Sequence, residues 1–171
     1  SVCIGVLTAW AGFLFVKQAF KSQKASLITA LLIAINPFQL QYALEARMYT
    51  FGAFFAVLAA YFISKALELQ RQSQTPITST ASLIAPMNNY KSKALLYYVL
   101  FAMAIAVIIL THYYLLFIAA ALCLYPLCYH IYFYRWNFKN YLLLLLSYFL
   151  IILSFLPWLK TSFWLTCLLL S

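Results

Sequence analysis

Three side chains able to bind or react, those of Glu45, Arg47 and Tyr49, lie within five positions of one another between two long apolar runs. Glu45 is one of only two acidic residues in the chain. A charge at the centre of a membrane helix costs roughly 2.5 to 3.5 kcal/mol on insertion scales, so a compensating role is expected. A guanidinium such as that of Arg47 is suited to holding an anion, either a phosphate or a carboxylate.

The surrounding chain has the composition of an integral membrane protein. Of its 171 residues 67% are hydrophobic, 19% are aromatic and only 8% are charged. The apolar runs do not alternate with polar residues as transmembrane β-strands do, so an all-α, polytopic bundle of transmembrane helices is predicted. We expect a single transmembrane domain over residues 1–171, with about six spans and the start of a seventh. The predicted spans are residues 2–20, 25–43, 49–67, 94–111, 113–133 and 140–158.

The basic residues predict how these spans are oriented. Nine of the eleven fall on one side of the predicted bundle, and only Arg47 and Lys160 fall on the other. By the positive-inside rule the first side is cytoplasmic, and it includes a flexible polar loop at about 68–93. The segments around Glu45 and His112 then meet at the outer face. The scattered cations form no dense patch, so no nucleic acid partner is expected. The chain contains no Cys-x-x-Cys pair, so the sequence predicts no metal site of that type.

Pro37 is expected to break the second span near its outer end, since it lacks a backbone N–H and disfavours helix at Asn36. The chain from there to Tyr49 is then free to bend into a cavity. If it stayed helical, Tyr42 and Glu45 would share one face of the helix. The alternative is a short solvated loop whose opposite charges happen to lie two positions apart. Arg47 opposes the positive-inside bias, which favours a binding role.

The stretch NPFQLQYALEARMYTFGAFFAVLAAYFISKAL resembles the Tyr-x-x-Glu-Ala-Arg-x-Tyr signature of bacterial membrane glycosyltransferases of the GT-C superfamily, in the family 39 or protein-mannosyltransferase-like group. The stretches THYYLLF and FLPWL fit the same pattern. The resemblance implies transfer of a sugar from a polyprenyl-phosphate carrier to an acceptor lipid, glycan or protein at the outer face of a bacterial inner membrane. It also implies a fragment lacking the first span and first outer loop, where such enzymes carry their main catalytic acid.

By the same resemblance, Glu45 is the acid of the second outer segment, supporting the catalytic base or a metal. Arg47 and Tyr49 are expected to bind the donor phosphate or sugar, with Tyr42 beside them, and His112 and Tyr113 are expected to bind phosphate or acceptor. A divalent cation is possible, but Glu45 alone offers too few oxygen ligands to predict one. For His112 the alternative is a structural histidine at the interface, and Glu68 is expected to form a surface ion pair with Arg71.

The alternative interpretation is that the chain is a non-enzymatic membrane protein, such as a lipid-linked sugar flippase or a secondary transporter. Transporters place their polar groups on broken helices near the bilayer midplane. Here the polar cluster is predicted at the outer rim, and the span interiors hold almost no ionisable residue. The pattern therefore favours the enzyme.

Overall fold

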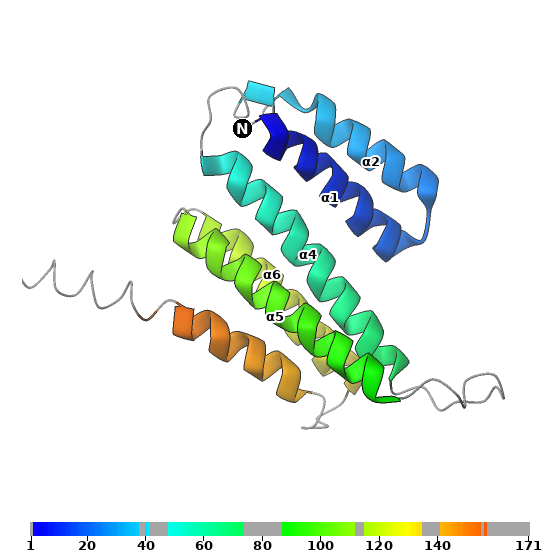
Figure 1. The fold of residues 1–171 in the computed structure, drawn as a ribbon, viewed down its shortest axis with the longest axis vertical. Helices are drawn as coiled ribbons and strands as arrows, with labels where there is room; N and C mark the ends of the chain where they lie inside the picture. Colours follow the sequence, from blue (N-terminus) through cyan, green and yellow to red (C-terminus); the bar gives the residue numbers. More distant parts are fainter. Residues whose placement is uncertain are drawn as a thin grey trace, which may run out of the picture.

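Helices make up all the regular structure in the part of the chain that the computed structural model describes (Figure 1), which is residues 2–37, 40–41, 48–73, 87–111, 115–134, 141–154 and 156. The predicted all-α class is therefore confirmed. The elements are α1 (Val2–Phe20), α2 (Gln23–Ile35), α4 (Met48–Gln72), α5 (Met87–Thr111), α6 (Leu116–Tyr134) and a last helix, Tyr141–Ser154.

Four of the described helices, α1, α4, α5 and α6, are long and apolar enough to cross a membrane, as in a multi-pass integral membrane protein. Of the about six predicted spans, these four are supported by the described residues, in which α2 and the helix Tyr141–Ser154 are shorter apolar helices. At 1.5 Å per residue the 13 residues of α2 extend only about 20 Å, against a hydrocarbon core of about 30 Å. The predicted start of a seventh span lies outside the described residues.

The predicted loop at about 68–93 is shorter than expected. Helix α4 continues to Gln72, and α5 already begins at Met87. The last turns of α4 are held by tertiary bonds, since the buried Tyr98 hydroxyl of α5 donates to the Gln70 Oε1 of α4 at 2.6 Å. Residues 74–86 lie outside the part that the structure describes.

A two-residue turn joins α1 to α2. Lys21 adopts a left-handed conformation with φ of 54°, and its backbone N–H donates to the Lys17 carbonyl at 3.1 Å, which ends α1. Ser22 then starts α2 as its N-cap, with its hydroxyl accepting from the Ala25 N–H at 3.4 Å. A non-glycine residue in this conformation is disfavoured, so other contacts of Lys21 must favour the turn.

The predicted break at Pro37 is confirmed. Helix α2 ends at Ile35, and Asn36 has an extended backbone with φ of −63° and ψ of 119°. This is the conformation that a following proline enforces. The break therefore has a local cause that lies in the sequence.

The core lies between α4, α5 and the helices that flank them (Figure 1). The core combines small buried side chains such as Ala59 and Ala66 with large ones such as Phe101, and many other large apolar side chains, among them Leu31 and Phe117, are exposed. Small residues let helix backbones approach closely in membranes, where lipid covers the large ones. This distribution fits a protein that faces hydrocarbon rather than water.

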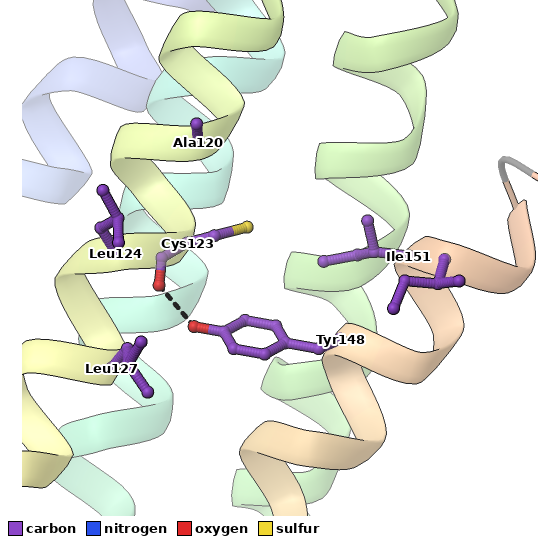
Figure 2. Close-up of a pocket in the computed structure, with 7 residues that line it drawn as sticks. Ala120, Cys123, Leu124, Leu127, Tyr148 and Ile151 are labelled. Carbon is purple, nitrogen blue, oxygen red and sulfur yellow. Dashed lines mark hydrogen bonds between the residues drawn. The ribbon is translucent and has the colours of Figure 1, made fainter.

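Helix α6 contains Pro126, which leaves the helix one N–H short. Figure 2 shows the ring of Tyr148 reaching across from the last helix, with its hydroxyl donating to the Cys123 carbonyl of α6. The buried His130 ring bonds the Pro126 carbonyl through Nδ1 at 2.8 Å, and since a carbonyl only accepts, Nδ1 carries the proton. Side chains thus give two carbonyls near the proline, those of Cys123 and Pro126, an additional donor.

The two ends of the bundle differ in composition. Helices α1 and α4 end, and α2 and α5 begin, at what we call the basic end, which carries Lys21, Lys24, Lys65, Arg71 and Lys93. Helices α2 and α5 end, and α4 and α6 begin, at the opposite end (Figure 1). The predicted gathering of these cations on one side of the bundle is confirmed.

Candidate functional site

Of the six predicted site residues the structure describes one, Tyr49, which lies at the opposite end. Tyr49 lies half-buried in the first turn of α4, next to the buried Thr50. Tyr42, Glu45 and Arg47, in the connection from α2 to α4, lie outside the described residues, as do His112 and Tyr113 between α5 and α6. Their neighbours in the chain are described and define the frame of the site.

A contact of Gly52 joins the start of α4 to the residue before α6. The buried Gly52, one turn into α4, lies so close to the side chain of Leu115 that a methyl group on Gly52 would overlap it. Leu115 directly precedes α6 and is itself buried. The connection holding Glu45 and Arg47 and the connection holding His112 and Tyr113 are therefore attached to helix ends in direct contact.

The second acidic residue, Glu68, lies at the basic end in a network between α1 and α4. Its carboxylate accepts from Lys21 Nζ at 2.7 Å and from Lys65 Nζ at 3.3 Å, and it also accepts from the Gln18 amide. Lys65 Nζ in turn donates to the Gln18 Oε1 at 3.2 Å. The expected pairing of Glu68 with Arg71 is wrong: the partners that the structure shows are Lys65 of the same helix and Lys21 of the turn after α1.

Sequence reasoning missed this network as a unit. The three-residue spacing of Lys65 and Glu68 was a usable signal, because residues three apart share a helix face. Nothing local links Glu68 to Lys21, which is 47 positions away. Such a contact depends on how α1 packs against α4.

Two mostly apolar hollows and one polar cavity lie among the described helices. The hollow of about 460 Å³ in Figure 2 lies between α6 and the last helix, where the Tyr148 hydroxyl is already bonded to a backbone carbonyl. A second hollow, of about 610 Å³, lies between α1, α4 and α6. The polar cavity, of about 230 Å³, lies at the basic end and is lined in part by Lys21, Glu68 and Arg71.

No protein-family model, curated protein or solved structure matches this chain. Across the described segments, no three His, Cys, Asp or Glu side chains gather as metal ligands. The chemistry of the chain must therefore be argued from its own residues. Glu45 and Arg47 remain the predicted reactive pair, and Lys21 and Arg71 are the cations placed at a cavity.

Proposed function

We propose that this chain is part of a GT-C-like membrane glycosyltransferase that moves a sugar from a polyprenyl-phosphate donor to an acceptor at the outer face of a bacterial inner membrane. The contact between Gly52 and Leu115 carries the proposal, since it brings the two connections with the predicted site residues to adjoining helix ends. The likeness of residues 42–49 to the family signature adds the chemistry.

Each residue has a stated part in the reaction. Arg47 grips two oxygens of the donor phosphate and stabilises the charge that builds on it as the sugar leaves. Glu45 supports proton removal from the acceptor hydroxyl. Tyr42 and Tyr49 bind the donor phosphate or sugar, and His112 and Tyr113 donate hydrogen bonds to phosphate or acceptor. A divalent cation, if used, would need oxygen ligands beyond Glu45.

Transfer of labelled sugar from polyprenyl-phosphate donors by membranes holding the full-length protein tests the proposal. Arg47→Ala should lower kcat/KM for the donor by about 100-fold or more, as removal of one stabilising donor does in other active sites. The kcat/KM of Arg47→Lys should lie between those of wild type and Arg47→Ala, because an ammonium group keeps the charge but cannot form the bidentate hydrogen bonds of a guanidinium. Lys93→Ala, an exposed cation at the basic end, is the matched control.

Equal transfer by wild type and Arg47→Ala, at equal amounts of folded protein, would refute the site. No transfer by the wild type from any polyprenyl-phosphate hexose or pentose would refute the reaction. In that event, movement of the intact lipid-linked sugar across vesicles would support a flippase instead.

A further inference from the structure

The polar cavity at the basic end has an excess of positive charge. It is lined in part by Lys21 and Arg71, which are exposed cations, and by the hydroxyl-bearing side chains of Tyr125 and Tyr129. Glu68 is the only acid in its wall. With Lys65 bonded to that same carboxylate, three cations face one anion, which leaves two positive charges in excess.

Arg71 is the cation best placed to receive a ligand. Lys21 and Lys65 already share the Glu68 carboxylate, whereas Arg71 forms no ion pair within the described part of the chain. Its guanidinium is a planar donor that matches two phosphate oxygens at once. An anion in the cavity would therefore meet Arg71 directly, with Lys21 on the α1 side.

The polar cavity continues into an apolar groove. Ala19, Ser64 and Tyr125 line both the polar cavity and the larger hollow of about 610 Å³ between α1, α4 and α6. Apart from Ser64 and Tyr125 this groove has apolar walls, among them Phe15, Ile63 and Ala121. A charged head and an apolar chain would thus find adjoining compartments of matching chemistry.

We propose that the cavity and groove together bind one anionic phospholipid, with its phosphate at Arg71 and Lys21 and an acyl chain along the groove. Basic pockets between membrane helices are a known means of holding anionic headgroups. The inference stands independently of the proposed function.

Native mass spectrometry of the purified full chain, titrated with phosphatidylglycerol or phosphatidylcholine, tests the site. Wild type should retain phosphatidylglycerol in preference to phosphatidylcholine. Arg71→Ala and Lys21→Gly should each weaken phosphatidylglycerol retention about fivefold, the worth of one cation near an anionic headgroup. Glycine suits the positive φ of residue 21, so the turn is kept. Lys93→Ala, at the same end but outside the cavity wall, should retain lipid as wild type does.

Two further variants separate binding from general damage. Glu68→Gln should strengthen phosphatidylglycerol retention, because it raises the excess charge while keeping a polar partner for the lysines. Ala121→Phe should weaken retention by filling the groove, whereas Ala34→Phe, on the exposed face of α2, should not. If these residues only stabilised the fold, Glu68→Gln and Arg71→Ala would not change phosphatidylglycerol retention in opposite directions.

Three results would overturn the proposal. One is equal retention of phosphatidylglycerol by wild type and Arg71→Ala. Another is displacement of the lipid by an equal concentration of inorganic phosphate, which would mean a site for free anions. The third is preferential retention of a polyprenyl phosphate over phosphatidylglycerol, which would place a carrier lipid there instead.

Discussion

The chain has two acidic residues, Glu45 and Glu68, and the structure describes the contacts of Glu68 alone. At the basic end Glu68 has two lysine partners and an amide, drawn from both α1 and α4. At the opposite end the described contacts are of another kind: a glycine packed against a leucine where α4 and α6 begin. A rare charge in an apolar chain is thus not a functional residue by rarity alone.

The largest expected effect contrasts Glu45 with Glu68. In the full-length protein Glu45→Gln should lower sugar transfer at least 100-fold with little change in thermal unfolding, because a neutral amide cannot assist proton removal. Transfer assays and thermal unfolding in detergent, made on the same preparations, check both parts. If Glu45→Gln lowered stability and left transfer per folded molecule intact, Glu45 would be structural like Glu68.

Next in size is the packing that frames the opposite end. Gly52→Val should destabilise the bundle by about 1 to 3 kcal/mol, the usual range for overpacking, because the buried Leu115 must move as a whole. Gly12→Val is the matched control and should cost less, since it mainly displaces the end of the half-buried Ile33 side chain. Unfolding by denaturant in mixed micelles measures both. Equal losses would show that the Leu115 contact is not special.

A smaller effect is expected at the buried hydrogen bond of the basic end. Tyr98→Phe removes the hydroxyl that donates to Gln70 and should reduce stability by about 1 kcal/mol, as for a typical neutral hydrogen bond. The same substitution at Tyr97, which is only partly buried, should change stability less. Hydrogen exchange of the last turn of α4 should rise in Tyr98→Phe alone. Unaltered exchange there would argue that the bond does not hold this turn.

The smallest effect is expected from the exposed ion pair. Lys21→Gly removes a partner whose side chain is 62% exposed, so the loss of the pair should cost less than about 1 kcal/mol. Relief of the positive φ at residue 21 should offset part of that cost. Thermal unfolding at low and high salt checks this, because screening should shrink the difference. A difference that persists in high salt would indicate packing rather than charge.

Much of the fold could be read from the sequence. Apolar runs between basic residues predicted α1, α4, α5 and α6 as long membrane helices, and Pro37 predicted the end of α2, because both signals act locally. Four of the about six predicted spans are long apolar helices among the described residues, and the backbone is interrupted at Asn36 before the proline. The candidate site was predicted from residue types alone. The contact between Gly52 and Leu115, at the starts of α4 and α6, is visible only in the tertiary structure.

The sequence by itself determined that this is a helical membrane protein whose described cations gather at one end, because hydropathy and charge act on each segment separately. Only the tertiary structure decided which charges meet. Glu68 pairs with Lys21 and Lys65 rather than with Arg71, and Arg71 lies at a cavity that opens into an apolar groove. Contacts between residues 47 positions apart depend on how the helices pack, and no local pattern encodes them.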